Sequence, residues 1–314
     1  MITKEDSMKY LYIFNYFSQF EESLAHGEFR AIFNEEYQRY YFTDIDYPYS
    51  RSVFIKERLT IWHEGQTIEE LVEKLYQDNL YYEDFKILYY KNKITHVDYQ
   101  ESLRWCRRLS DPIDGSTDLV HPKVEFALTK IHDTFYFGLL EHNRDWHLHE
   151  DKPNSYSHSL PLRVARTAVN LGVGKESDLK IIDPCCGVGT VVLEGLSMGL
   201  NIVGSDINRY VAYQARGNLK YYGYDPERIW RQDIHDIKET YDLAIIDVPY
   251  GVFSAFDKEA QLDLIKATYK FAKKVVIISH DDYTKEIEAM GFTIINQCYY
   301  RKSNFMRYLT TVMR

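Results

Sequence analysis

Several features that would define other protein classes are missing from this 314-residue sequence. No apolar run reaches the roughly 18 residues that a membrane-spanning helix needs, so we expect no membrane association. The N-terminus is charged and polar, unlike a signal peptide. The four cysteines include no C-x-x-C pair and no zinc spacing, so we expect neither a disulfide framework nor a metal site. A reducing, cytoplasmic location is the expectation that follows.

An excess of positive charge is also missing. The chain has 38 Lys and Arg against 47 Asp and Glu, a net charge of −9. Residues 1–150 carry −10 of this and residues 151–314 carry +1. Nucleic-acid-binding proteins usually present a basic field, because phosphate contacts dominate their affinity. RNA binding would therefore need a partner protein or local clusters, for which the candidates are Arg104, Arg107, Arg108, Arg163, Arg166, Arg301, Lys302 and Arg307.

The length is typical of two domains. Residues 1–150 mix strand and helix patterns, including a hairpin around 132–133, and predict an α+β domain for substrate recognition or partner binding. Residues 151–314 alternate buried strands near 180, 202, 229, 243 and 275 with helices, which predicts a mostly parallel, doubly wound α/β sheet. A closing antiparallel pair is expected over 292–298 and 305–312. The three histidines of the connector 141–155 lack a metal-ligand pattern.

A glycine-rich turn follows the first strand of this second half, in the order Asp183-Pro184-Cys185-Cys186-Gly187-Val188-Gly189-Thr190. Glycines there would let the backbone approach a ligand closely. The next strand ends at Asp206, where an acid can accept both hydroxyls of a ribose. A third strand ends at Asp233, which could accept from an adenine amine, with Asp236 as an alternative. This order of turn and acids predicts a nucleotide-like cofactor.

Two cofactors fit such a fold. A nicotinamide dinucleotide favours G-x-G-x-x-G, and Val192 occupies the third glycine position here. The carboxylate of Asp183 would repel a pyrophosphate but attract the sulfonium and amino groups of S-adenosylmethionine. The acidic turn therefore favours S-adenosylmethionine.

The tetrapeptide Asp247-Val248-Pro249-Tyr250 follows a fourth apolar strand. The Asp247 carboxylate and the Val248 carbonyl can accept hydrogen bonds from an exocyclic amine, and Tyr250 can stack on a flat base. The alternative is a turn that merely ends the strand. Together with the cofactor pattern, the tetrapeptide predicts methylation of an amino group on a base.

The second half resembles the THUMP-associated RNA methylases, and within them the tRNA guanosine-10 N2-methyltransferase-like group. The resemblance rests on residues 183–190, 204–208 and 247–252 and on the approach segment 152–171. It implies a Rossmann-like S-adenosylmethionine-dependent methyltransferase domain over 151–314, with tRNA as substrate and, in some lineages, a small zinc-binding activator subunit. It also implies the cofactor contacts Ser157, Asp183, Pro184, Cys185, Gly187, Gly189, Thr190, Asp206, Ile207, Asp233 and Ile234.

One position departs from the family pattern, which has a proline where this chain has Val248. A fixed φ is lost there, which predicts a less ordered loop. The predicted function is an S-adenosylmethionine-dependent RNA methyltransferase acting on guanine N2 of tRNA. The alternatives are adenine N6 methylation of DNA or rRNA, and an inactive scaffold, which Val248 and the acidic first half favour.

Overall fold

The computed structural model describes residues 8–144, 146–155, 160–249, 257–302 and 305–314. The chain forms two compact units. The first comprises Met1–Phe14, Gln38–Tyr49 and Ile55–Asn143, and the second comprises Asn15–Tyr37, Ser50–Phe54 and Arg144–Arg314. The prediction of one boundary after residue 150 differs from this division, because residues 15–37 and 50–54 belong to the second unit.

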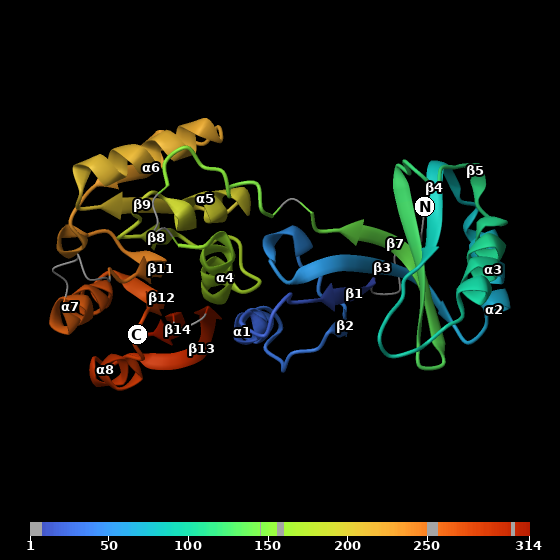
Figure 1. Cartoon of the computed structure of the whole chain (residues 1–314), viewed down its shortest axis with the longest axis horizontal. Coiled ribbons are helices and arrows are strands. Elements are labelled where there is room, and N and C mark those ends of the chain that lie inside the picture. The colour runs from blue at the N-terminus through green and yellow to red at the C-terminus, as the bar shows by residue number, and fades with distance from the viewer. Residues whose placement is uncertain (1–7, 145, 156–159, 250–256, 303–304) are drawn as a thin grey trace. The chain divides into compact units, whose positions relative to one another are not determined.

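The first unit is an α+β fold around a sheet with the strand order β2-β1-β3-β7-β6-β4-β5 (Figure 1). The predicted hairpin is confirmed, since β6 and β7 pair antiparallel up to Ile131 and Thr134, with His132 in the turn at φ 55°. The hydroxyl of Thr67 caps α2 by accepting from Glu70 N (3.2 Å). The elements are β1 (Lys9–Phe14), β2 (Tyr40–Thr43), β3 (Ile55–Gly65), α2 (Ile68–Asp78), β4 (Tyr81–Tyr89), α3 (Tyr99–Ser110), β5 (Asp114–Thr117), β6 (Val124–Ile131) and β7 (Thr134–His142).

The second unit contains the predicted doubly wound sheet, in the order β10-β9-β8-β11-β12-β14-β13. Strands β8 to β12 are parallel, and β14 pairs antiparallel with both β12 and β13, as the predicted closing pair requires. The strands are β8 (Ile181–Asp183), β9 (Ile202–Asp206), β10 (Ile229–Arg231), β11 (Tyr241–Asp247), β12 (Ala272–Ser279), β13 (Thr293–Lys302) and β14 (Phe305–Met313).

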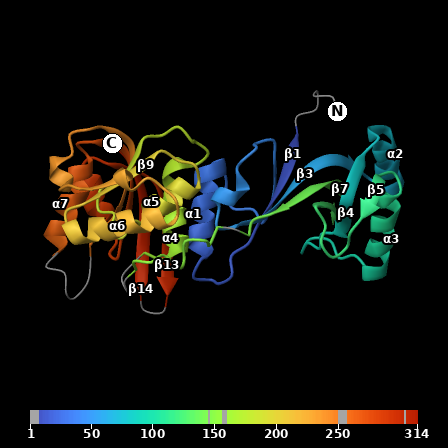
Figure 2. The same ribbon diagram turned by 90° about the horizontal axis from the view of Figure 1, so that it is seen from above.

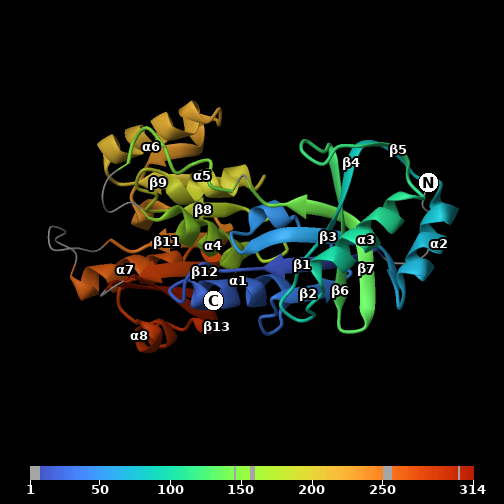
Figure 3. The same ribbon diagram turned by 45° about the vertical axis from the view of Figure 1, so that its right-hand side comes forward.

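Helices cover both faces of this sheet. Helices α5 and α6 pack at the β8–β10 side, and α8 packs on β13 (Figure 3). A core of buried side chains lies between the sheet and α7 and α8, including Ile246, Ile277 and Ile265. The helices are α1 (Glu22–Phe33), α4 (Leu162–Val173), α5 (Thr190–Ser197), α6 (Arg209–Tyr221), α7 (Lys258–Thr268) and α8 (Thr284–Ala289), with 3-10 turns η1 (Tyr49–Arg51), η2 (Pro226–Arg228) and η3 (Ile234–Asp236).

The face of the sheet opposite α7 and α8 is covered by α4, which also packs on α5, and by α1 from the N-terminal part of the chain (Figure 2). A Cβ added to Gly172 would lie 2.5 Å from the side chain of Leu243, so α4 approaches β11 closely. A Cβ added to Gly27 would lie 2.8 Å from Cys298, so α1 approaches β13 in the same way. Helix α1 is therefore part of the core of the second unit. Among the residues that the structure describes, no helix is long and apolar enough to cross a bilayer.

Candidate functional site

Backbone hydrogen bonds hold the glycine turn in place, one within the turn and one to β9. Cys186 N donates to Ser205 O (2.9 Å) and Gly189 N donates to Cys186 O (2.8 Å). Gly187 and Gly189 have φ values of 53° and 81°, a left-handed conformation that L-residues adopt only with strain. These contacts join the end of β8 to the end of β9 and leave α5 starting at Thr190.

Asp206 is fixed against this turn. Its Oδ2 accepts from Gly187 N (3.0 Å) and its Oδ1 accepts from Asn208 N (2.8 Å). An ionised carboxylate has about four lone-pair sites, so each oxygen can accept a further hydrogen bond. The carboxylate is thus held in one orientation and can still accept from a ligand.

Asp233 follows β10 and caps η3. It accepts from His235 N (2.9 Å) and contacts His235 Nδ1 (2.8 Å), while His235 Nε2 contacts Asp263 (2.8 Å). Hydrogen bonds from the His235 backbone and ring hold the pKa of Asp233 below its usual value. Of the two acids considered for this position, Asp233 lines the cavity described below, and Asp236 is not among the described residues that line it.

Asp247 ends β11, and Val248 continues the sheet for one more residue. Val248 N donates to Ile278 O (2.9 Å) in β12, and the Val248 side chain is 1% exposed within the apolar core. A proline at this position has no N–H and could not make this bond. The hydrogen bond to β12 therefore fixes the backbone at the position where the fixed φ of a proline is absent.

Restoring the family's proline should therefore weaken this protein. We expect V248P to lose the bond to Ile278 O at a cost of about 1–3 kcal/mol, because a buried acceptor is left without its partner. For a unit of this size that corresponds to a fall in Tm of roughly 2–4 °C per kcal/mol. Thermal unfolding measures it, with V248A, which keeps the N–H, as the control for lost packing. A V248P protein as stable as the wild type would contradict this account.

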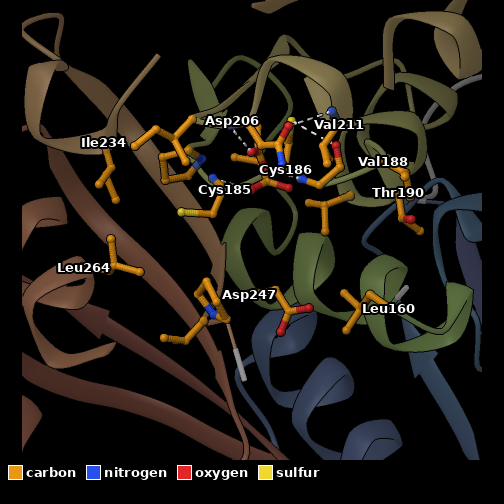
Figure 4. A pocket seen from close by; sticks show the side chains of 18 of the residues that line it. Leu160, Cys185, Cys186, Val188, Thr190, Asp206, Val211, Ile234, Asp247 and Leu264 are labelled. Carbon is orange, nitrogen blue, oxygen red and sulfur yellow. Dashed lines mark hydrogen bonds between the residues drawn. The ribbon is translucent and has the colours of Figure 1, made fainter. Parts of the chain in front are cut away.

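The loops at the carboxyl ends of β8 to β11 enclose one cavity of ≈ 550 Å³. In Figure 4, Asp206 lies with Cys185 and Cys186 on one side of the cavity, and Asp247 lies with Leu160 on the other. The predicted residues that line it are Asp183, Pro184, Cys185, Gly187, Thr190, Asp206, Ile207, Asp233, Ile234, Asp247, Val248 and Pro249. Gly189 shapes the turn at the start of α5. Ser157 and Tyr250 lie outside the described residues.

Several lining residues were not predicted as site residues. They are Leu160, Cys186, Val188, Val191, Asn208, Val211, His235 and Leu264. The cap position of Asn208, two residues after Asp206, was a usable signal, because it accepts from Tyr210 N and Val211 N at the start of α6. Leu264 had no such signal, because only the packing of α7 brings it to the cavity.

The cavity brings together buried carboxyl groups whose ionised forms are disfavoured. Burial raises the pKa of Asp183 well above its usual value, and the charges of Asp247 and Asp206 raise it further. Burial also raises the pKa of Asp206, and that of Asp247 to about 7. Burial followed by the nearby carboxylates raises the pKa of the Cys185 thiol, so it stays protonated. A positively charged ligand would relieve this repulsion.

Two of the arginines considered for RNA contact are buried instead. Arg166 is 4% exposed, pairs with Glu194 (2.6 Å) and donates to Ser50 O (2.6 Å). The other carboxylate oxygen of Glu194 contacts Nδ1 of His149 (2.7 Å), one of the connector histidines. Arg307 is 3% exposed. The proposal of RNA contact is wrong for Arg166 and Arg307, because both side chains are enclosed by the fold. Within the described residues, no group of three or more His, Cys, Asp or Glu could hold a metal.

Part of the second unit is similar in sequence to known proteins. Residues 153–279 match the UPF0020 family, described as an RMKL-like methyltransferase domain. A tRNA (guanine(10)-N2)-dimethyltransferase of Methanothermobacter thermautotrophicus is 36% identical over 103 residues, which are 32% of this chain and 30% of that protein. One of Pyrococcus abyssi is 29% identical over 169 residues, half of each chain. This chain thus matches half or less of the length of these two relatives.

Solved structures resemble the chain over nearly its whole length at low identity. TrmN from Thermus thermophilus has a TM-score of 0.48 and 13% identity, with 98% of this chain and 99% of that chain covered. A predicted N6-adenine-specific DNA methylase from Listeria monocytogenes has a TM-score of 0.45 and 16% identity, with 96% of each chain covered. Likeness at this level supports no statement about activity. By sequence, residues 153–279 of this chain are similar to the RMKL-like methyltransferase domain.

Proposed function

We propose that this protein is an S-adenosylmethionine-dependent RNA methyltransferase that modifies an exocyclic amine, guanine N2 of tRNA. One observation carries the proposal. A single cavity is lined by the glycine turn, by Asp206 and Asp233, and by the Asp247-Val248-Pro249 segment. Open α/β sheets bind ligands at the carboxyl ends of their strands, which is where this cavity lies.

The residues present fit S-adenosylmethionine. Its amino group and sulfonium are cationic, and the cavity contains buried carboxylates whose pKa values are raised by burial and, at Asp183, by mutual repulsion. Asp206 would hold the ribose hydroxyls and Asp233 the adenine amine, with Ile207 and Ile234 against the ring. Ser157 and the turn residues would complete the site. When bound, the cofactor supplies an electrophilic methyl group.

The Asp247 carboxylate and the Val248 carbonyl would accept hydrogen bonds from the amine of the substrate. The lone pair of an exocyclic amine is delocalised into its ring, and hydrogen bonds to two acceptors would localise it on nitrogen. Asp247 would then take the proton that the alkylated nitrogen releases. Tyr250 would stack on the base, which must leave its helical stack to enter. Alignment of this kind can lower a barrier by about 7–11 kcal/mol.

The choice of tRNA and guanine N2 rests on the relatives, which are named as tRNA (guanine(10)-N2)-dimethyltransferases. The proposal places the protein in the cytoplasm, where it would meet tRNA. Its first unit would contact RNA or a partner protein. A small activator subunit would be one such partner.

The test is methylation of tRNA transcripts with labelled cofactor, followed by nucleoside analysis. We expect N2-methylguanosine or its dimethyl form, lost when guanine 10 is replaced. N6-methyladenosine would instead establish the adenine alternative, with rRNA and DNA as competing substrates. Absence of S-adenosylmethionine binding in calorimetry would favour the scaffold. Full turnover by the chain alone would remove the activator subunit from the proposal.

A further inference from the structure

Asp247 has a basic neighbour on the same face of the sheet. Asp247 is opposite Ile278 in β12, and Ile278 is opposite Leu309 in β14. Opposite residues of neighbouring strands point to one face, and so do residues two apart in one strand. Arg307, two residues before Leu309, therefore shares the face of Asp247. His280 directly follows Ser279, the last residue of β12.

Arg307 is the cation of this group. Arg307 is buried, with only 3% of its surface exposed. Burial and the charge of Arg307 lower the pKa of His280 to about 4, so its imidazole is neutral near pH 7. Burial raises the pKa of Asp247, and the charge of Arg307 opposes that effect. The same guanidinium thus acts on two titratable groups, one at the end of β11 and one directly after β12.

The other ionisable groups around Asp247 do not supply this charge. Asp183 in β8 adds negative charge, and its pKa is raised in part by Asp247. The Cys185 thiol is protonated. On α4, Arg163 pairs with Glu21 (3.4 Å) and Arg166 pairs with Glu194 (2.6 Å). Among the described residues around this carboxylate, Arg307 is the cation whose charge stabilises its ionised form.

We infer that Arg307 is a positioning residue whose buried guanidinium favours the ionised form of the Asp247 carboxylate, the form that can accept the proton of the amine. The inference rests on the proposed function of the cavity. It assigns a role in the reaction to β14, the antiparallel strand of the sheet, and it explains why an arginine is buried beside an acidic cavity.

The first test is the pH dependence of tRNA methylation by R307M and R307K, compared with the wild type. The acid limb of the wild-type profile should lie near pH 7. In R307M it should move upward by about one pH unit or more, since a nearby arginine lowers a carboxyl pKa by about 1–3. R307K keeps the charge and should leave the limb near its wild-type position. If R307M and R307K showed the same pH profile of methylation, the inference would be overturned.

The second test needs no activity, so it separates this inference from the proposed function. The folded-state pKa of Asp247 is raised, so its protonated form stabilises the fold; this contribution is complete below about pH 3.8 and is lost as pH rises through about 7. In R307M the loss should extend to higher pH, and Tm should fall most, relative to R307K, above pH 7.

A neutral residue at position 247 provides the control. In the D247N background, R307M and R307K should show parallel Tm curves across the neutral range, because residue 247 no longer titrates. If R307M alone fails to fold, recovery of folding in D247N/R307M supports the inference, and failure of both overturns it. If the Tm cycle behaves as expected and no RNA is methylated, the proposed function fails while the role of Arg307 stands.

Discussion

Methyl transfer by D247A should fall about 10²- to 10³-fold, with S-adenosylmethionine affinity nearly unchanged. The alanine removes both the acceptor that orients the amine and the group that takes its proton, and the loss of such a group costs about this much. Asp247 lies at the end of β11, across the cavity from the Asp206 side where the ribose would be held (Figure 4). The effect should therefore appear in the rate at saturating cofactor.

Single-turnover rates and calorimetry on the same preparations separate the two quantities. D247N serves as the matched variant, because its amide oxygen still accepts a hydrogen bond but cannot take a proton. It should retain more activity than D247A and should lack the acid limb near pH 7. If D247A turned over at the wild-type rate, Asp247 would be only a residue that ends a strand.

The second large effect is expected on cofactor affinity. D206A should weaken S-adenosylmethionine binding by about 10- to 100-fold, because each hydrogen bond to a charged group contributes about 1.5–3 kcal/mol. The loss also frees Gly187 N, whose bond to Asp206 Oδ2 holds the glycine turn. Isothermal titration calorimetry of the apo protein measures the change directly.

D236A provides the control for D206A. It removes the same charge at an exposed position, the last residue of η3, and its affinity for the cofactor should match that of the wild type. The cofactor affinity of D233A should lie between those of D206A and D236A, since Asp233 already forms a hydrogen bond with His235. Equal binding by D206A and D236A would show that the cofactor does not contact Asp206.

The elements of the second unit were predictable because buried parallel strands are near-continuous apolar runs with glycine or acidic residues at their ends. The glycine turn and the acids at 183, 206 and 233 followed from that pattern alone. Position 248 did not, because the backbone bond to Ile278 O is a contact between strands 30 residues apart along the chain. From the sequence, position 248 could be described only by the absence of a proline.

Long-range packing also explains the other differences. Basic residues such as Arg166 and Arg307 look solvent-exposed in a sequence, and only the tertiary structure shows the acids and carbonyls that enclose them. Amphipathic spacing over residues 18–33 predicts a helix with one buried face, but not the surface that covers it. That surface is formed by α4 and β13, which no local pattern connects to α1.

The position of α1 has a consequence for how the protein is made. The amide of Asn296 donates to Gly27 O (2.9 Å), a contact that spans 269 residues of chain. During synthesis α1 leaves the ribosome well before β13, a strand that it packs against. The part of the helix that β13 covers in the folded unit must stay uncovered until that strand has emerged, and transiently exposed apolar surface of this kind favours aggregation.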